Sequence, residues 1–547
     1  MSDITVTIED GQLGLVNVTG EDLFVHAGVC ANGVVDTLYD FGDIPTAVAA
    51  LGPGTLTENV ADTIAVAGES LAAPVNPSQA GTVGSTTHTG TGAGTVTGSA
   101  GPLYQILVKI STGGTLGTMQ AEFSVNGGGY SAPVTSVVSS WAYLVPGTLT
   151  VLTFAAQTYT LNDVWTITTA GGITVVGAGT AGWVTQASSP ADVYDVLVDV
   201  VVGGALGTAT FTYSVDGGNS ISPVILVPGG GVYVIVGTGI ILTFASTFVA
   251  DDLYEFTTTT AGFTTTDVGN MLTAIGALPN QWAGVHIAGM GANAAAAASM
   301  VATVESALEA FAVAYRYVMG IVECPQGDSA AESAFASVTA TRTMVTVTDI
   351  EHQSSVSRGV VHRRNCGVVI TSRLSATNPS QDPGWVGSPL GSLANVQAIF
   401  RDEAKTPGLA AQRFTVLTTR PTKTGYFCKS GNMMAPYGSD FSSVGNRRVM
   451  DVACRVTVGV LVNELNADVL ANPDGTIFGP EATRIEGVVI GALSNVLLAP
   501  SPPDASSVNA VVNRSVNVIT TENLDIAVQI VPKAQFKTIT ETIGYSL

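Results

Sequence analysis

The segment GGTLGT at residues 113–118 recurs as GGALGT at residues 203–208. FSVNGG at residues 123–128 likewise recurs as YSVDGG at residues 213–218, so both pairs are 90 residues apart. Self-similarity at a fixed period is typical of a duplicated structural module. The same spacing relates Pro133 to Pro223 and Leu152-Thr153-Phe154 to Leu242-Thr243-Phe244. The sequence therefore predicts two tandem copies of one fold.

Each copy has the pattern of a β structure. The runs Leu103–Ile110 and Tyr194–Val202 are rich in β-branched residues and predict strands. Asn126-Gly127 and Asp216-Gly217 predict tight hairpin turns, because type I′ turns need positive φ at both central positions. Each copy is expected to form a small all-β sandwich or barrel.

The two β copies are predicted to occupy residues 101–172 and 190–263. Joints rich in Gly, Thr and Ser separate them, at residues 81–101 and 171–190. A Thr-rich run closes each copy and suits a pleated sheet edge. These closing runs are Trp165–Thr169 and Tyr254–Thr260.

From about Asp267, helical spacing alternates with short apolar runs, which predicts an α/β domain with a mixed sheet. Helices are expected at Val268–Leu278, Ala292–Val318, Leu390–Glu403, Asn446–Leu465 and Pro480–Leu497. Strands are expected at Ile4–Ile8, Val285–Ala288, Tyr317–Glu323, Met344–Thr348, Val368–Thr371 and Gln535–Ile543. A hairpin is expected from Ser515–Thr520 and Leu524–Val531.

The predicted fold class is α+β multidomain: a C-terminal α/β core with a mixed sheet, two tandem inserted all-β modules and extended terminal strand arms. The non-β parts are divided as follows: an N-terminal arm over 1–20, the N-terminal part of the core over 21–100, a central α/β domain over 264–440, a helical domain over 441–514, and a C-terminal strand arm over 515–547.

Charge is unevenly distributed along this acidic chain, whose net charge is −22. Residues 1–300 contain one basic residue, Lys109, and 21 acidic residues, a balance of −20. Such a surface repels DNA phosphates, which disfavours nucleic-acid binding. The simplest interpretation is solubility, since like charge keeps crowded neighbours apart; a specific cationic ligand is the alternative.

Cysteine usage and the N-terminus bear on the cellular compartment. The cysteines form no CxxC pair, which fits free thiols better than a disulfide framework. MSDITVTIED lacks the regions of a signal peptide, and the Ala-rich stretch from Ala292 is interrupted by Glu305, Glu309 and Arg316. We expect a soluble cytoplasmic product. The five cysteines are Cys30, Cys324, Cys366, Cys428 and Cys454.

The sequence contains no HExxH, P-loop or GxSxG pattern, so it offers no common catalytic motif. Residues 90–94, GTGAG, lack the Lys of a phosphate loop and are expected to be a flexible joint. His352, His362 and Cys366 match no common zinc spacing. The adjacent Asp402-Glu403 would point in different directions on a helix. We expect no enzyme activity, metal site or cofactor.

Arg363-Arg364 and Arg447-Arg448 are the only adjacent basic pairs. In so acidic a chain they suggest acidic partners, whereas solvated faces with ordinary ion pairs would contribute little. Both possibilities stay open for Arg447-Arg448. A nucleic-acid role is disfavoured, because no broader basic patch with interleaved aromatic residues accompanies them.

A series of short motifs follows in a fixed order. They are Leu51–Leu56, Tyr315–Val318, Arg363-Arg364 before Gly367–Ile370, Arg401–Glu403, Gly425–Phe427, Ser439–Phe441, Asn446–Asp451, Val531-Pro532 and Ile543–Tyr545. In this order the chain resembles the contractile phage tail sheath family, over most of its length. The doubled β modules resemble the insertions that such sheaths carry.

The resemblance implies a structural subunit that polymerises as a helical stack of hexameric rings around a tail tube. Contraction would drive the tube through a host envelope for genome ejection. The implied partners are the chain itself, the tail tube protein, and baseplate and tail terminator proteins, with no direct nucleic acid and no membrane insertion. The implied location is a virion tail assembled in the host cytoplasm.

In this family, terminal arms add strands to sheets of neighbouring subunits. A lone strand or hairpin is unstable, and an open edge on another chain satisfies its backbone groups. Candidate exchange residues are Ile4, Val6, Ile8, Val516, Val518, Ile526, Val528 and Ile530. Candidate tube- or neighbour-facing charges are Arg447, Arg448, Lys533 and Lys537.

Three alternatives stay open. The chain could be the sheath of a bacterial contractile injection system, which differs from a phage sheath only in context. A β-repeat surface adhesin is a different class, and it would predict an export signal. A hydrolase would need a clustered acid–base pair, which the sequence does not suggest.

Overall fold

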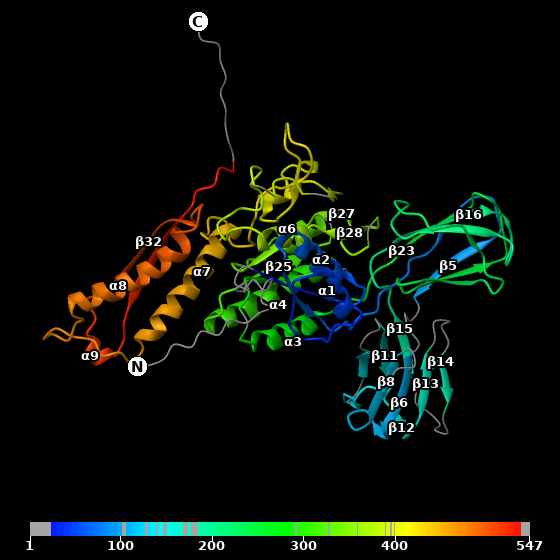
Figure 1. Ribbon diagram of the computed structural model, residues 1–547, viewed down its shortest axis with the longest axis horizontal. Coiled ribbons are helices and arrows are strands. Elements are labelled where there is room, and N and C mark those ends of the chain that lie inside the picture. The colour runs from blue at the N-terminus through cyan, green and yellow to red at the C-terminus, as the bar shows by residue number, and fades with distance from the viewer. Residues whose placement is uncertain are drawn as a thin grey trace, which may run out of the picture.

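The computed structural model describes residues 23–537, except 101–105, 126–128, 138–140, 146–149, 168–172, 177–183, 280, 290–292, 326–328, 358, 389, 394–395 and 399. Figure 1 shows an α/β core in the middle, helices α7 (Val444–Leu461) and α8 (Gly479–Leu493) at one end, and two β modules at the other. The expected strand Ile4–Ile8 and most of Gln535–Ile543 lie outside the described residues.

A six-stranded sheet forms the core, in the order β2-β3-β1-β24-β25-β26. All neighbours are parallel except β2, which is antiparallel to β3, so the sheet is mixed as predicted. Parallel strands covered on both faces become continuous buried runs. The strands are β1 Phe24–Gly28, β2 Tyr39–Phe41, β3 Ser70–Pro74, β24 Gly284–Ile287, β25 Met319–Glu323 and β26 Thr343–Thr346.

Helices cover both faces of this sheet. α3 and α4 pack on one face, and α2 and α6 pack together on the other. α3 starts at a capping box in which the Thr264 hydroxyl and the Asp267 carboxylate satisfy each other's backbone N–H groups. The helices are α1 Ile44–Leu51, α2 Thr55–Ala67, α3 Thr265–Gly276, α4 Ala294–Val313, α5 Ser329–Phe335 and α6 Gly367–Ser375.

Helix α4 is long and apolar enough to cross a membrane by length and composition alone. In this fold it lies against the sheet, and its residues Val301, Val304 and Leu308 are buried in the core. Glu305 on the same face accepts backbone hydrogen bonds from Thr341 and Arg342, at 2.6 and 3.0 Å. The helix therefore packs as an element of the core.

The two β modules share one strand order. The first module has sheets β14-β13-β6-β8-β9 and β10-β11-β15, and the second has β4-β23-β16-β18-β19 and β20-β21-β5. This equivalence agrees with the predicted duplication. In the first module the strands are β6 Ile106–Thr112, β8 Gln120–Val125, β9 Val134–Thr135, β10 Trp141–Leu144, β11 Thr150–Phe154, β13 Val164–Ile167, β14 Ile173–Val176 and β15 Val184–Ser188. In the second they are β4 Thr87–Thr89, β5 Thr95–Ala100, β16 Asp195–Val202, β18 Thr210–Ser214, β19 Ile225–Leu226, β20 Val232–Ile235, β21 Ile240–Ala245 and β23 Leu253–Thr257.

The module boundaries differ from the prediction. The segments 81–101 and 171–190, expected to be joints, supply β4–β5 and β14–β15. These strands cover β23 and β13, so the Thr-rich closing strands lie inside their sheets and not at an edge. Residues 90–94 form the β4–β5 connection and are fixed by Asp252, whose carboxylate accepts from the amides of Thr91 and Gly92.

The turn predicted at Asp216-Gly217 belongs to a longer loop between β18 and β19. Positive φ falls on Gly217 and Gly218, one residue later than expected. The Asp216 carboxylate organises the loop by accepting from the amide and hydroxyl of Ser220. Asn126-Gly127 lies outside the described residues.

Two expected elements of the second half are wrong. Val368–Thr371 lies in helix α6, because a short apolar run does not separate a strand from a buried helix. Leu390–Glu403 contains β29 (Val396–Ala398), which pairs with β27 (Asp349–Gln353) beside β28 (Val361–Asn365). Asp402-Glu403 therefore lies on a short 3₁₀ turn, where the two side chains reach different partners.

The expected hairpin at 515–531 also has a different first strand. Ser515–Thr520 contains the helical turn α9 (Val518–Thr521), because the Asn517 side chain caps its first amides. β33 (Ile526–Pro532) pairs instead with β32 (Ala505–Val512), antiparallel over the whole length of both strands.

Helix α7 docks on the core through buried ions. The Asp451 carboxylate accepts from Arg342 of the core at 3.0 Å and from Arg447 on its own helix. Arg448 donates to the carbonyls of Thr377 and Asn378, and its guanidinium lies 5.9 Å from the ring centre of Phe24. These contacts fix the C-terminal helices relative to the sheet.

We predict that Asp451→Asn lowers the free energy of unfolding by about 3–5 kcal/mol, because it leaves two guanidinium groups buried without their anion. Denaturant unfolding of both proteins measures the difference. Glu464→Gln is the matched control, since its partner Arg484 is an exposed side chain, and its cost should be about 0–1 kcal/mol. Equal effects of the two substitutions would contradict the anchoring role.

Candidate functional site

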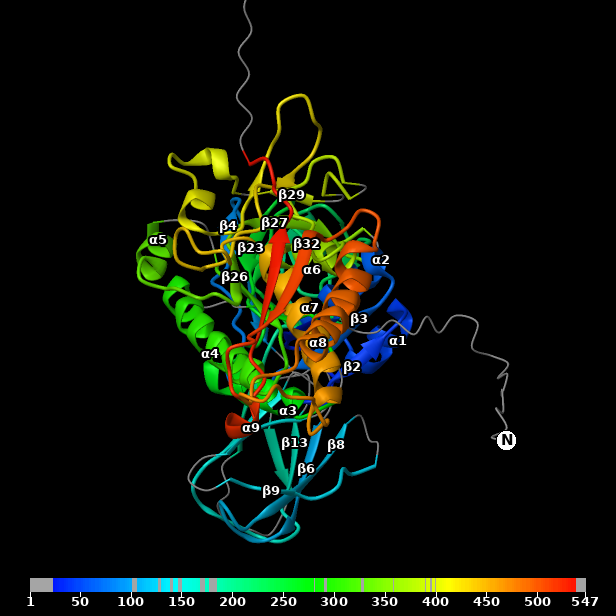
Figure 2. The ribbon, with the colours of Figure 1, turned by 90° about the vertical axis from the view of Figure 1, so that its left-hand side faces the viewer.

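The β32–β33 hairpin is a two-stranded sheet whose outer edges have no strand partner among the described residues. Figure 2 shows the two strands side by side along helices α7 and α8. Ile526, Val528 and Ile530 alternate along β33 and pack toward these helices. The packing holds the hairpin in one orientation. At the end of the β32 edge the Val512 amide donates to the Glu486 carboxylate, and the β33 edge pairs with no other strand among the described residues.

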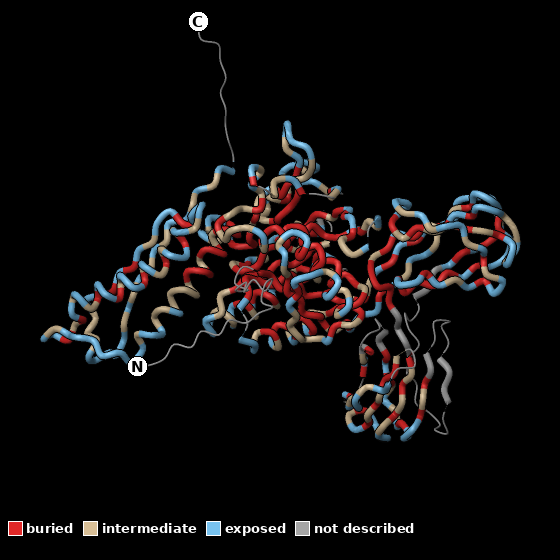
Figure 3. Tube along the Cα trace, in the orientation of Figure 1, coloured by how far each residue is buried: buried red, intermediate tan, exposed pale blue. Residues whose placement is uncertain are grey.

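Apolar side chains are exposed at both ends of this hairpin. Leu465, Leu470 and Ile519 are 70%, 63% and 64% exposed, and Phe536 is 91% exposed. Figure 3 shows the core as largely buried and the end with α8 and α9 as exposed or half-buried. Exposed apolar side chains of this size are candidates for contact with a partner.

The sequence-predicted exchange residues divide into three groups. Ile526, Val528 and Ile530 lie on β33 as strand residues. Val516 and Val518 lie in the connection between β32 and β33, Val516 in a bend and Val518 in α9. The last two are therefore corrected, since they form no strand. Ile4, Val6 and Ile8 lie outside the described residues.

Of the four charges predicted to face the tube or a neighbour, two are buried and two are not. Arg447 and Arg448 are each 4% exposed and bound within their own subunit, so the expectation that they face a partner is wrong. Lys533 donates to the carbonyl of Pro503, and the exposed Lys537 donates to Ser430 Oγ. Only these two lysines remain candidates for contact with a neighbour.

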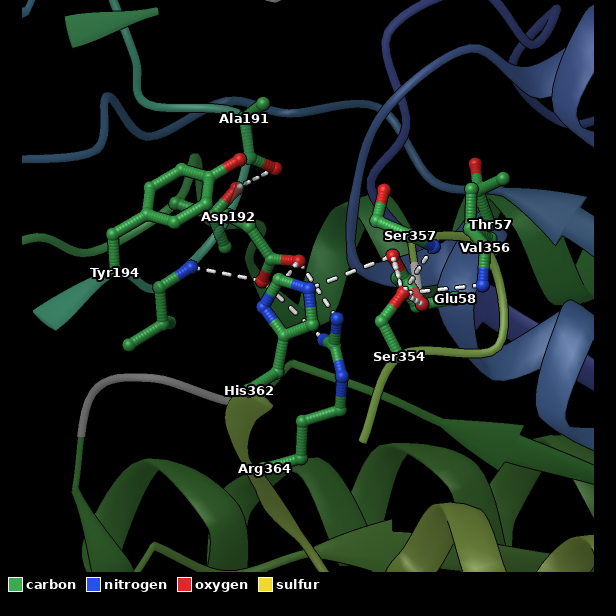
Figure 4. Close-up of polar contacts among 12 residues, drawn as sticks. Thr57, Glu58, Ala191, Asp192, Tyr194, Ser354, Val356, Ser357, His362 and Arg364 are labelled. Atoms are coloured by element: carbon green, nitrogen blue, oxygen red, sulfur yellow. Dashed lines mark hydrogen bonds and ion pairs between the residues drawn. The ribbon is translucent and has the colours of Figure 1, made fainter. Parts of the chain in front are cut away.

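A second candidate site is the polar joint between the core and the β modules (Figure 4). Asp192 enters from the segment before β16 and receives both Arg364 amino groups, at 2.7 and 3.3 Å. His362 lies two residues before Arg364 on strand β28, between Asp192 and Glu58. Its Nδ1 is 3.7 Å from the Asp192 carboxylate and its Nε2 is 3.5 Å from the Glu58 carboxylate. Ser354 donates to Glu58 from the turn after β27.

Charges in this joint compensate for its burial. Burial opposes the ionisation of Glu58, but the hydrogen bond with His362 and the charges of Arg364 and His362 outweigh it and lower the pKa. Burial also opposes the charge on Arg364, and the carboxylates of Asp192 and Glu58 overcome it and raise the pKa. Beside them, burial raises the pKa of Asp62, which accepts from Ser355 and lies 3.8 Å from His352.

A buried chain of hydrogen bonds crosses the core sheet. His26 on β1 faces His286 on β24, with 3.0 Å between the two Nδ1 atoms. His26 Nε2 lies 2.7 Å from Thr63 Oγ1, and His286 Nε2 lies 3.1 Å from the Glu323 carboxylate. Burial and then His286 lower the pKa of His26, so this imidazole is neutral. The chain ties helices to strands and brings no nucleophile to the surface.

A cavity of about 560 Å³ lies at the base of the β modules, beside the carboxyl ends of β24 and β25. Thr55 and Asn59 of α2 line it, and Thr55 Oγ1 and Asn59 Oδ1 have no protein partner among the described residues. Water ordinarily satisfies polar groups in such a space. No group of three potential metal ligands occurs in the described part of the chain.

Sequence reasoning missed most of the buried polar groups. It considered His352 and His362 only with Cys366, whereas the structure pairs the two histidines across strands and adds Glu58, Asp62 and Asp192. One signal was visible: His26 and His286 each interrupt an apolar strand in the similar segments VHAG and VHIAG.

The sequence was compared with known families and with curated proteins. The family model described as "DUF2586, N-terminal domain" matches residues 1–432. The chain belongs to the DUF2586 family. The match includes the core sheet and both β modules, and α7, α8 and the β32–β33 hairpin lie beyond it. No curated protein matches the sequence.

This DUF2586 chain is also similar to solved structures. The sheath tail protein of Desulfitobacterium hafniense is 11% identical over 97% of this chain and 100% of that one, with a TM-score of 0.41. The sheath tail protein of Listeria innocua is 11% identical over 94% and 96%, with a TM-score of 0.41. The contracted sheath complex of an extracellular contractile injection system is 12% identical over 51% and 74%, with a TM-score of 0.38.

For the joint of this DUF2586 protein we predict that Glu58→Gln costs about 1–3 kcal/mol of unfolding free energy at pH 7, because the buried acceptor loses its charge. The folded-state pKa of Glu58 is depressed below 4.5. Its contribution is therefore complete above pH 4.5 and is lost as pH falls through the folded value.

Unfolding of the wild type and the variant, followed from pH 7 down to pH 3, measures the difference. The two curves should converge at the acid end. Glu481→Gln on the exposed side of α8 is the matched control, since the side chain of its partner Arg484 is 44% exposed. A difference for Glu58→Gln that stays constant with pH would contradict the role of its charge.

Proposed function

We propose that this chain is a structural subunit of a contractile sheath, and that it polymerises by completing the β32–β33 hairpin with strands from neighbouring subunits. The observation that carries this proposal is the hairpin itself, a two-stranded sheet that pairs with no other strand in the described part of the chain. An isolated open edge invites pairing with another chain, and monomeric proteins usually block such edges.

The candidate donor is the N-terminal segment of a neighbouring subunit. Ile4, Val6 and Ile8 alternate with polar residues, so all three would lie on one face of an added strand. The apolar face of the hairpin packs on α7 and α8, and a strand added in register would extend that packing. The exposed Phe536 and Lys537 lie just beyond β33 and are candidates for contact with the same neighbour.

Contraction in this proposal needs no nucleotide or catalytic residue. Rigid cores would change their packing around a tail tube, while strands shared between subunits keep the lattice connected. New contacts between subunits, summed over many copies, would supply the free energy. Hexameric rings, the tail tube, and baseplate and terminator proteins are the partners that the sequence resemblance implies. The contracted sheath would drive the tube through an envelope.

Two settings fit this proposal, a phage tail that ejects a genome and a bacterial injection machine. A β-repeat adhesin is less well supported, because the modules are tied to the α/β core by the buried Arg364–Asp192 pair and do not form a separable head. The adhesin hypothesis also does not account for the large core and the β32–β33 hairpin.

We predict that the purified protein forms striated hollow tubes, visible by negative-stain electron microscopy. Ile4→Asp/Val6→Asp/Ile8→Asp should abolish the tubes and leave folded monomers, because a charged strand cannot pack on the helices. Thr5→Asn/Thr7→Asn changes the opposite face and serves as the matched control, which should polymerise normally. Tubes formed by the triple aspartate variant would refute strand addition by this segment.

We also predict that the β modules are dispensable for polymerisation. Gln79 and Gly262 exchange backbone hydrogen bonds of 3.0 and 2.8 Å, so residues 81–261 can be replaced by a short glycine linker at this point. Arg364 is left unchanged, because the deletion removes Asp192 but keeps Glu58, whose carboxylate also compensates the charge of Arg364. Electron microscopy should still show tubes. A folded deletion variant without tubes would show that the modules belong to the lattice.

A further inference from the structure

Each β module includes a pair of strands that comes from the other sequence unit. β4 and β5 precede the first module, yet they pair with β23 and β21 of the second. β14 and β15 precede the second module, yet they pair with β13 and β11 of the first. Each module thus takes its outer strand pair from the segment that leads into the other module.

The two strand pairs occupy equivalent places in the same register. Val96 and Thr97 of β5 lie opposite Phe244 and Thr243 of β21. Val184 and Thr185 of β15 lie opposite Phe154 and Thr153 of β11. Phe154 and Phe244, like Thr153 and Thr243, are matched positions of the 90-residue repeat. The Val-Thr dipeptide therefore meets the same partners in both modules.

The outer pair also belongs to the sequence repeat. Gly92–Thr95 and Gly177–Thr180 are both Gly-Ala-Gly-Thr, and Val96-Thr97 recurs as Val184-Thr185. Pro102 and Tyr104 after the first pair match Pro190 and Tyr194 after the second. Each sequence unit therefore begins with a strand pair and continues into a module.

We propose that the β arm is built by reciprocal strand donation between two tandem sequence units, and that the open edge of each module is a binding site for this strand pair from either unit. A unit that closed on its own pair would make the same cross-strand contacts, since the register is shared. In the exchanged form β5 and β6 belong to different modules, as do β15 and β16, so the chain passes between the modules twice and couples them mechanically.

Cysteine pairs in the full-length protein test which edge each pair occupies. Thr97, Thr153 and Thr243 are exposed on their strands, and directly opposed strand residues lie within reach of a disulfide. Under mild oxidation Thr97→Cys/Thr243→Cys should cross-link within one chain, and Thr97→Cys/Thr153→Cys should not. The unsubstituted protein controls for its own cysteines, four of which are buried. A cross-link between positions 97 and 153 in place of 243 would overturn the exchange.

Two in-register deletions test whether the strand pairs are interchangeable. Deletion of 101–188 joins Ala100 to Ser189 and keeps the second module with its present pair, so Thr97→Cys/Thr243→Cys should still cross-link. Deletion of 87–173 joins Thr86 to Thr174 and leaves the second module only β14–β15.

In the second deletion, Thr185→Cys/Thr243→Cys should gain a cross-link that the full-length chain does not form. If only the first deletion variant folds, or if both fold and this cross-link does not appear, the strand pairs are not equivalent and the proposal fails.

Discussion

Backbone hydrogen bonding along strand edges is the constraint on which this architecture depends. A strand edge leaves N–H and C=O groups that need a partner, and the chain satisfies them in two ways. In the β modules, β4–β5 and β14–β15 pair with the inner strands of the opposite units and become the outer strands of their sheets. In the β32–β33 hairpin, nothing in the described part of the chain closes the sheet. The first arrangement builds sheets of three and five strands within one subunit, whereas the second leaves a sheet of only two strands, which is the physical basis of the proposed polymer.

Buried ions hold these β elements in fixed places around the core sheet. Arg364 binds Asp192 at the base of the modules, and Asp451 binds Arg342 where α7 meets the sheet. A buried pair is costly to break, because either partner alone would be an uncompensated charge. The joints therefore resist rotation. In the proposed sheath, movement during contraction would occur between subunits, with the core, its helices and the modules of each subunit moving together.

The sequence was informative wherever a pattern was periodic. The 90-residue repeat predicted two equal β modules, and helical spacing predicted α3, α4, α7 and α8 close to their observed positions. Short apolar runs were ambiguous, so Val368–Thr371 was assigned as a strand although it lies in α6. Arg447 and Arg448 were expected outside because charge favours solvent; burial is possible here because Asp451 and backbone carbonyls receive them. Such long-range pairing cannot be derived from local pattern.

Cryo-electron microscopy of the assembled polymer, at a resolution that traces the backbone, tests the central claim most directly. The account predicts a third strand, from a different subunit, hydrogen-bonded to an edge of the β32–β33 hairpin. A polymer in which both edges of every hairpin remain unpaired, held together by other surfaces, would contradict it.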